Sequence, residues 1–431
     1  MRKPLSALVC LALGLVTLSP AAADLFSYLA KPDDSFSWQL RSVEELPQGK
    51  VYDLHLVSQV WQGIKWEHQL QVYEPTKVTY PDIMALLVTG GGAGEEARAL
   101  GLMAANMAGM RLAALYHIPN QPLFGGLTED ALISYTWVKY LETGDEDWVL
   151  LFPMVKSVVR AMDCLESLAA ERWNQQLRGF VVTGASKRGW TTYLTAIADP
   201  ERVVAIAPMV FDILNIPVSA RHHLDFWGFY SPMIDDYTEK GLEAVIDTPR
   251  GFRLFFIVDP YSYRYRLTMP KLIVLGSNDP YWPTDAVTLY WPGLPQPKYL
   301  LIAPNSGHGL DDKVRVLTSV SAFLKLAASD GPWPQLQWRW TDKADGSELQ
   351  IVCKPRAAEA RLWVARNKVR DFRQAQWVQQ ALEVGGEAVT GKAEAADGQW
   401  TAAYGEVVLE LPQGRLITST EPRVISPRIP G

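Results

Sequence analysis

Residues 181–190 read VVTGASKRGW, an apolar strand that runs into a tight turn and then into a helix. Ser186 stands at the turn, the place of the nucleophile in a strand–turn–helix nucleophile elbow. Because this turn is sharp, the serine needs small neighbours, and Gly184 and Ala185 meet that need. The usual pattern has a glycine two residues after the serine. Here Arg188 holds that place and the glycine comes one residue later. The motif favours a nucleophile over the simpler alternative, a serine that only caps the following helix.

Strands and helices alternate on both sides of this motif. Residues 51–57 and 64–73 alternate apolar and polar side chains and predict a hairpin, while residues 83–88 are continuously apolar, as in a central strand. The remaining pattern predicts strands at 111–116, 179–183, 203–207, 272–275 and 299–302, and helices at 95–108, 128–142, 148–172, 191–198 and 311–328. This alternation predicts an α/β fold, a mostly parallel sheet with helices on both faces and the hairpin as an antiparallel edge.

An acid and a histidine follow the last two predicted core strands. Asp279 comes four residues after the strand at 272–275, and His308 lies between two glycines after the strand at 299–302. The order serine, acid, histidine is that of the α/β-hydrolase fold. We therefore expect Ser186 as nucleophile, His308 as base and Asp279 as the acid that orients it. Asp285 is the rival acid, and Asp279 has the alternative role of closing a turn before a proline.

Acyl transfer also requires donors for an oxyanion, which are normally backbone N–H groups. The N–H of Lys187 is one candidate, and the glycine-rich turn at 89–94, with Gly91 and Gly92, is the other. A phosphate-binding loop would need Lys followed by Ser or Thr after its last glycine, whereas two glutamates follow here. The side chains of Lys187 and Arg188 favour anionic or carboxylate-bearing substrates, unless they simply lie in solvent on the helix.

Residues 211–268 interrupt the alternation and contain twelve aromatic residues. A connection of this kind lies over the carboxyl ends of parallel strands, where ligands bind. We interpret it as a cap and expect Trp227 to contact substrate. The alternative is a helical subdomain that only packs on the core. His222 and His223 lie in this segment and are expected to shape the cleft rather than to act as the base.

The N-terminus has the features of a cleaved export signal. Two basic residues precede an apolar stretch from Leu5 to Leu18, and a small-x-small site ends before Asp24. The apolar stretch is shorter than the ~20 residues that a membrane-spanning helix needs. We therefore predict a signal peptide at residues 1–23 and a periplasmic or secreted mature protein.

Three further parts are expected after the signal. An α/β-hydrolase domain is predicted at residues 24–330, with the cap at about 211–268. The sequence Gly-Pro-Trp-Pro at 331–334 marks a boundary, beyond which short alternating runs predict a small β-sandwich-like domain at residues 333–431.

Composition excludes some classes of partner. The 431 residues include 41 Lys and Arg and 47 Asp and Glu, a net charge of −6, without a basic block, which argues against nucleic acid as a partner. Cysteine and histidine show no metal-ligand spacing, so neither a metal nor a cofactor is predicted. Signal cleavage would leave Cys164 and Cys353, which we expect to be buried thiols; a disulfide between them in an oxidising compartment is the alternative.

Five segments of the chain stand out together: Gly184–Trp190, the cap run His222–Pro232, and the segments 259–264, 267–271 and 304–308. They resemble a known family, the PhoPQ-activated pathogenicity-related proteins. The resemblance runs from about residue 40 to the C-terminus. It implies an exported α/β-hydrolase with a Ser186, Asp279 and His308 site, and it names no substrate. The family often has Gly-Asp where this chain has Asn278 before Asp279.

The sequence thus predicts a serine hydrolase that cleaves an ester or an amide through an acyl-enzyme, with esters favoured by analogy to the fold. Two alternatives stay open. One is a non-catalytic binding or virulence-associated protein on a hydrolase scaffold. The other is a secreted peptidase.

Overall fold

The computed structural model describes residues 24–428, and a large sheet crosses most of this part of the chain. In chain order its strands are β1 (Ser37–Leu46), β2 (Gly49–Trp61), β3 (Ile64–Pro75), β4 (Ile83–Val88), β5 (Leu112–Leu115), β6 (Gly179–Ala185), β7 (Val203–Met209), β8 (Lys271–Gly276), β9 (Lys298–Ala303), β12 (Glu359–Asn367), β13 (Val378–Ala381), β15 (Trp400–Leu411), β16 (Gly414–Ser419) and β17 (Arg423–Ile425).

The strand order is β1-β2-β3-β5-β4-β6-β7-β8-β9-β16-β15-β12-β13, with β17 beside β15. The neighbours from β5 to β9 pair in parallel, and the strands outside this block pair antiparallel. The predicted α/β fold is confirmed. The predicted hairpin is β2–β3, but it is not the edge, because the unpredicted β1 pairs with the outer side of β2.

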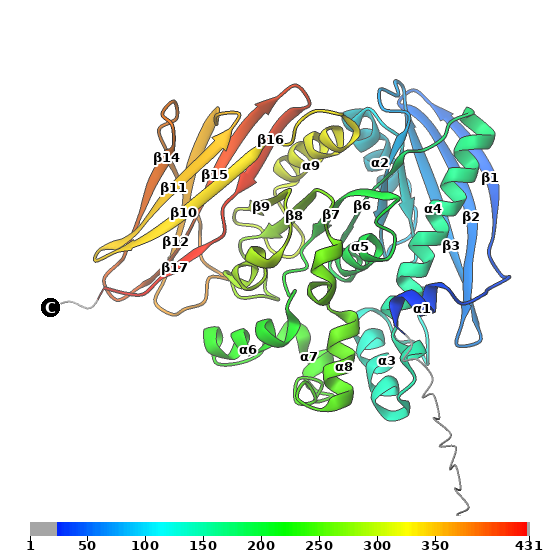
Figure 1. Cartoon of the computed structure of the whole chain (residues 1–431), viewed down its shortest axis with the longest axis horizontal. Coiled ribbons are helices and arrows are strands. Elements are labelled where there is room, and N and C mark those ends of the chain that lie inside the picture. The colour runs from blue at the N-terminus through cyan, green and yellow to red at the C-terminus, as the bar shows by residue number, and fades with distance from the viewer. Residues whose placement is uncertain (1–23, 429–431) are drawn as a thin grey trace, which may run out of the picture.

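Helices cover both faces of the parallel block (Figure 1). Outside the cap, the helices are α1 (Leu25–Leu29), α2 (Glu95–Ala108), α3 (Glu129–Thr143), α4 (Leu151–Trp173), α5 (Lys187–Ala198) and α9 (Lys313–Ala328), with short 3₁₀ turns η1 (Glu146–Trp148), η4 (Ala286–Leu289) and η5 (Trp291–Gly293). Helices α2 and α9 pack together on one face, and α4 and α5 on the other. Helix α5 begins directly after Ser186, four residues earlier than predicted.

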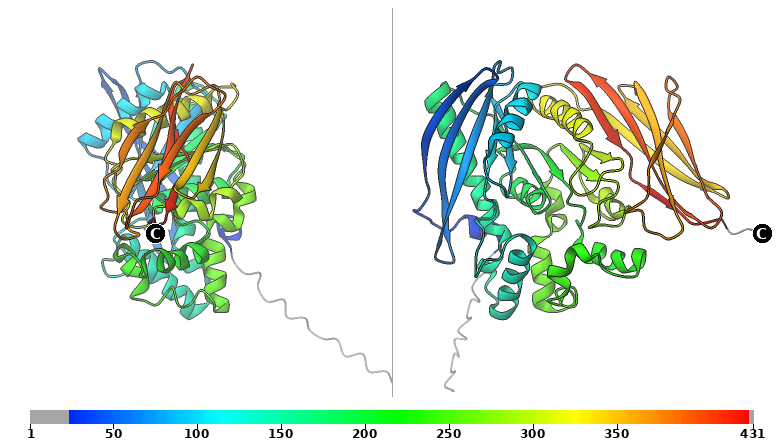
Figure 2. Two further views of the ribbon diagram at one scale, coloured as in Figure 1. Left: turned by 90° about the vertical axis from the view of Figure 1, so that its left-hand side faces the viewer. Right: turned by 180° about the vertical axis from the view of Figure 1, so that it is seen from behind.

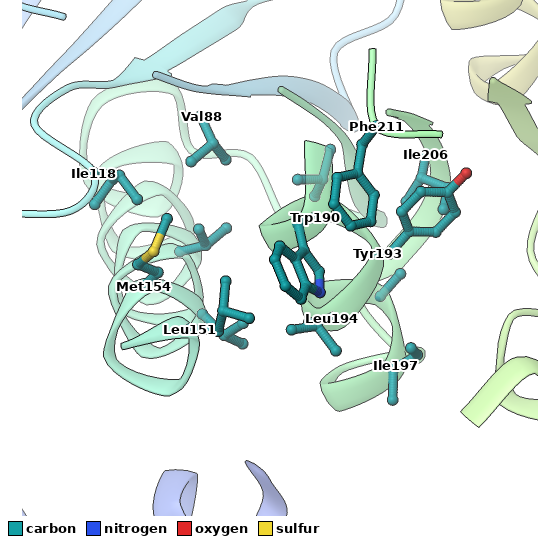
Figure 3. Packing of buried hydrophobic residues seen from close by; sticks show 14 of the residues in the cluster. Val88, Ile118, Leu151, Met154, Trp190, Tyr193, Leu194, Ile197, Ile206 and Phe211 are labelled. Atoms are coloured by element: carbon teal, nitrogen blue, oxygen red, sulfur yellow. The ribbon is translucent and has the colours of Figure 1, made fainter. Parts of the chain in front are cut away.

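A buried apolar layer joins α4 and α5 to the sheet. Figure 3 shows Trp190 of α5 facing Leu151 of α4, whereas Tyr193 points to the side of α5 away from α4. The Trp190 ring stacks on Phe211, which follows β7, with ring centroids 4.9 Å apart. This packing holds α5, which begins directly after Ser186, against β6 and β7.

The segment that the sequence analysis interprets as a cap lies between β7 and β8. It contains α6 (Ile216–Trp227), η2 (Pro232–Ile234), α7 (Asp235–Thr238), α8 (Pro249–Val258) and η3 (Pro260–Arg266). These elements gather with α3 at one end of the parallel strands (Figure 1), and α3 packs against both α7 and α8.

The C-terminal strands form two facing sheets at the far edge of the molecule (Figure 2). The smaller sheet consists of β10 (Gln335–Lys343), β11 (Gly346–Lys354) and β14 (Val389–Glu394). The larger one, β16-β15-β12-β13, continues the main sheet because Ser419 of β16 pairs with Leu300 of β9. The predicted C-terminal β-rich region is confirmed, and its connection to the core sheet was not foreseen.

Two other sequence-based expectations concern the N-terminus and the cysteines. The predicted signal peptide lies outside the described residues. Between residues 24 and 428, no helix combines the length and the apolar character needed to cross a bilayer. Cys164 and Cys353 are unpaired; Cys164 is buried as expected, whereas Cys353 is only partly buried.

Candidate active site

Ser186 sits in a strained turn between β6 and α5. Its backbone φ of 58° and ψ of −127° lie in a region that residues other than glycine rarely adopt. Two backbone hydrogen bonds hold it there. The Ser186 N–H donates to the Met209 carbonyl at 2.9 Å, and the Ser186 carbonyl accepts from the N–H of Trp190 at 3.0 Å. The residues around Ser186 therefore form the sharp strand-to-helix turn that the sequence predicts.

Glycines on both sides of Ser186 permit this turn. A Cβ at Gly184 would lie 2.7 Å from the carbonyl oxygen of Arg188, and one at Gly189 would lie 2.8 Å from the carbonyl oxygen of Met209. Both distances are too short for a side chain. The close approach to the neighbouring strand falls at Gly189, which explains why glycine stands three residues after the serine in this chain.

His308 and Asp279 form a hydrogen-bonded pair. Nδ1 of His308 lies 2.8 Å from Oδ2 of Asp279, and Oδ1 of the same carboxylate accepts the backbone N–H of Tyr281 at 3.0 Å. The Asp279 side chain is buried. Nε2 of His308 is shielded from solvent and has no hydrogen-bond partner within residues 24–428. A carboxylate at Nδ1 favours the tautomer with its proton there, which leaves Nε2 as a proton acceptor.

A cavity extends from Ser186 to the cap and encloses about 770 Å³ including its open mouth. Ser186 and Lys187 line it, as does Tyr281, whose ring lies against His308 with centroids 4.2 Å apart. Aromatic and aliphatic side chains make up most of the remaining wall: Trp137, Trp190, Phe211, Ile213, Ile216, Ala220, Tyr230, Ile234, Tyr237, Leu242, Ile246, Phe255 and Trp282. The apolar lining is typical of a site for a small organic ligand.

The side chains of Lys187 and Arg188 are buried and paired, not in solvent. Nζ of Lys187 lies 2.9 Å from Glu129 and 3.0 Å from Asp130, and Arg188 binds both oxygens of Glu129 at 2.6 Å. Burial would raise the pKa of Glu129, but the hydrogen bonds and charge of Arg188 together with the charge of Lys187 lower it to about 2. These cations are therefore neutralised within the protein.

The two glycines singled out for the oxyanion site lie in the turn after β4. This turn starts beside the nucleophile strand, since Val88 pairs with Gly184. The Gly91 carbonyl accepts the N–H of His117 at 3.2 Å, and Gly92 lies next to the same imidazole. Neither glycine belongs to the wall of the cavity described above.

Trp227 lies at the end of α6, outside the wall of the cavity. Its ring stacks on Phe229, and the guanidinium of Arg373 lies 4.4 Å from its centroid. Its position is thus between the cap and the C-terminal region.

The rival acid, Asp285, pairs with a different histidine. Oδ1 of Asp285 lies 2.7 Å from Nε2 of His222 in the cap, and Oδ2 lies 3.6 Å from Arg370. Asp285 therefore bonds to His222 and not to His308, which favours Asp279 as the acid that orients His308.

The sequence reasoning missed a contact between the C-terminal region and the loops that carry Asp279 and His308. The side-chain oxygen of Asn305 accepts the N–H of Trp377 at 2.7 Å, and its amide donates to the Trp377 carbonyl at 2.9 Å. Asn305 precedes His308 by three residues. The motif around His308 contained this asparagine, but no local signal points to its partner 72 residues later.

Asp212, three residues after the end of β7, was also missed. Its carboxyl group is buried and accepts a hydrogen bond from the Tyr290 hydroxyl at 2.7 Å. Burial, with smaller contributions from the charges of Asp279 and Asp285, raises its pKa to about 8. Across residues 24–428, His, Cys, Asp and Glu form no group of three or more arranged to hold a metal ion.

Comparison with known proteins identifies the family. A family model for PhoPQ-activated pathogenicity-related protein matches residues 25–373. Autocrine proliferation repressor protein A of Dictyostelium discoideum is 32% identical over 366 residues, which cover 80% of this chain and 73% of that protein.

The fold is shared with a solved structure at low sequence identity. An acetyl xylan esterase from Paenibacillus sp. R4 is similar with a TM-score of 0.50 and 14% identity, covering 69% of this chain and 90% of that one. Acetyl xylan esterase 1 from Thermoanaerobacterium sp. gives a TM-score of 0.48 and 15% identity, covering 72% and 95%. The resemblance noted from the sequence is thereby confirmed. The chain has an α/β-hydrolase scaffold and belongs to the PhoPQ-activated pathogenicity-related protein family.

Proposed function

We propose that this protein is an exported serine hydrolase that cleaves an ester through an acyl-enzyme. The observation that carries the proposal is the hydrogen-bonded pair of His308 and Asp279, 2.8 Å apart. Nε2 of His308 has no partner among the described residues, and the imidazole packs against Tyr281, which lines the same cavity as Ser186. The strained backbone of Ser186 supports it, because such strain clusters at functional residues.

In the proposed reaction, Nε2 of His308 takes the proton of the Ser186 hydroxyl as Oγ attacks the substrate carbonyl. The negative oxygen accepts hydrogen bonds from the N–H of Lys187 and from the turn that contains Gly91 and Gly92. The imidazolium, stabilised by Asp279, then gives its proton to the leaving alcohol as the C–O bond breaks. Water, deprotonated by His308, attacks the acyl-enzyme and releases the acid and Ser186.

Labelling with a fluorophosphonate probe tests the nucleophile directly. The purified protein from Asp24 onward is expected to be labelled, and Ser186→Ala to remain unlabelled while keeping its circular dichroism spectrum. If the folded protein reacts with neither this probe nor a smaller sulfonyl fluoride, the proposal fails and a binding role on the hydrolase scaffold replaces it. A panel of matched ester and peptide substrates separates the esterase from the peptidase alternative.

Export is a second part of the proposal, because the segment before Asp24 has the pattern of a cleaved signal. N-terminal sequencing of the protein recovered from the periplasm or medium tests it. A mature chain that starts at Asp24 supports export, and a full-length chain found only in the cytoplasm contradicts it.

A further inference from the structure

The cations beside Ser186 leave no positive charge for a ligand. Among the described residues that line the cavity, Lys187 is the only Lys, Arg or His side chain. It is held between Glu129 and Asp130. The other oxygen of Asp130 accepts the Tyr237 hydroxyl at 2.9 Å. An anionic substrate would therefore meet only a cation that is already paired.

In contrast to these paired groups, the cap part of the same wall contains a carboxylate, Glu243, with one oxygen that lacks a partner among the described residues. Oε2 of Glu243 is shielded from solvent and has no hydrogen-bond partner among the described residues. A carboxylate oxygen in this state carries a desolvation cost that a donor on a ligand would relieve.

Within the described residues, His223 and Arg221 of the same cap segment form no ion pair with Glu243. Burial lowers the pKa of the His223 imidazole, which lies between Tyr230 and Trp282, to about 4, so this ring is neutral. Arg221 lies largely in solvent, where Nη2 is 3.4 Å from Asp247. The wall of the cavity as a whole carries an excess of negative charge.

Aromatic rings line the same cavity as Glu243 and Ser186. Tyr230 is close enough to Glu243 for the carboxylate charge to add to burial in raising the pKa of its phenol. The Trp137 ring lies 5.4 Å from Tyr237 and 5.6 Å from Phe255, and all three line the cavity. Ring faces attract cations, most strongly where water is excluded.

We infer that the cap cavity binds a cationic nitrogen, so that the substrates are esters whose apolar part under the cap carries an ammonium group facing Glu243. The ester part of this inference rests on the proposed function, whereas the binding of a cationic nitrogen in the cavity does not depend on it. The charge of this substrate class is opposite to that of the anionic substrates that the sequence predicted from Lys187 and Arg188.

Three ligands that share one carbon skeleton test the inference: 4-phenylbutylamine, 4-phenylbutan-1-ol and 4-phenylbutanoate. Their binding to the Ser186→Ala protein is measured by titration calorimetry at neutral pH. The amine is expected to bind about tenfold or more tightly than the alcohol, and the carboxylate more weakly still. Equal binding of amine and alcohol, tighter binding of the carboxylate, or no binding of any of the three overturns the inference.

A pair of isosteric variants locates the effect. Glu243→Gln, made in the Ser186→Ala background, should remove the preference for the amine, whereas Glu239→Gln, which removes a charge from the exposed surface next to α7, should retain it. A preference that survives in Glu243→Gln contradicts the assignment of this residue. Because calorimetry requires no turnover, a protein that binds the amine but resists fluorophosphonate labelling would keep the cation site and lose the proposed hydrolase function.

Discussion

The side-chain amide of Asn278 donates to the backbone carbonyl of Ala375 at 2.7 Å, and so joins the residue before Asp279 to the C-terminal region. The same amide lies 3.1 Å from the carbonyl oxygen of Phe372 and 3.3 Å from that of Arg373. The place where the family often has glycine therefore holds an anchor in this chain, and the loop at residues 372–375 rests on the loop that carries the proposed catalytic acid.

Asn278→Ala is predicted to lower kcat for ester hydrolysis by about tenfold with little change in KM, because a shifted Asp279 no longer holds His308 in place. Unfolding in urea should show a loss of about 1–3 kcal/mol, the cost of leaving buried carbonyls without their donor. Steady-state kinetics on a chromogenic ester measure the first effect.

Asn106→Ala is the matched control. Its amide also donates to two backbone carbonyls, those of Gln48 and Leu102, each at 2.8 Å, but on helix α2 outside the site. It should lose stability and keep kcat. If both variants lose kcat equally, or if Asn278→Ala loses none, the anchor has no catalytic role.

The two candidate acids make opposite predictions. Asp279→Asn should reduce kcat by about 10³–10⁴-fold, because an amide at Nδ1 permits the wrong tautomer of His308. Asp285→Asn should leave kcat close to the parent value, since Asp285 bonds to His222. Parallel measurement of kcat with one ester decides between them, and the reverse ranking would transfer the role to Asp285.

The local parts of the site could be predicted from the sequence because they depend on neighbours in the chain. The elbow at Ser186 is encoded by small residues next to it, and Asp279 and His308 follow strands whose apolar runs are visible. The pairing of Lys187 and Arg188 could not be predicted. Their partner Glu129 lies more than 50 residues earlier, and no local pattern distinguishes a paired cation from a free one.

Three features of the fold were not predicted from the sequence, and each has a physical reason. Strand β1 alternates over only its first five residues and exposes the next four, so its pattern is too short to stand out as a half-buried strand. The first turn of α5 holds two charges and a glycine, which conceal a helix that starts directly after Ser186. The junction between β9 and β16 depends on one residue pair separated by more than 100 positions.

Gly184→Ala is predicted to disrupt the elbow. The added Cβ would lie 2.7 Å from the carbonyl oxygen of Arg188 and 2.9 Å from its Cβ, so the start of α5 must move. Overpacking of this kind costs about 1–3 kcal/mol, and the displaced Ser186 should react with fluorophosphonate far more slowly than in the parent.

Gly94→Ala serves as the comparison for this variant, because a Cβ there meets no atom within 4 Å and the backbone is extended. Urea midpoints and labelling rates close to those of the parent are expected. A Gly184→Ala protein that labels at the parent rate would show that the turn accommodates a side chain.

The buried Asp212 makes a prediction about pH. The pKa of about 8 in the folded protein lies above the ordinary aspartate value of 3.8, so between these values the unfolded chain releases a proton that the folded protein keeps. Stability contributed at this site therefore falls as pH rises through this window and levels off above it. Asp212→Asn keeps an oxygen that accepts the Tyr290 hydroxyl and removes the titration.

The stability of Asp212→Asn relative to the parent should thus increase by roughly 1 kcal/mol per pH unit between about pH 5 and pH 8. Urea unfolding at four or more pH values measures the slope of this difference. Asp330→Asn, which removes a carboxylate from an exposed position, should show no comparable slope. A flat difference for Asp212→Asn would mean that Asp212 is ionised in the folded protein despite its burial, and that a donor other than the Tyr290 hydroxyl stabilises its charge.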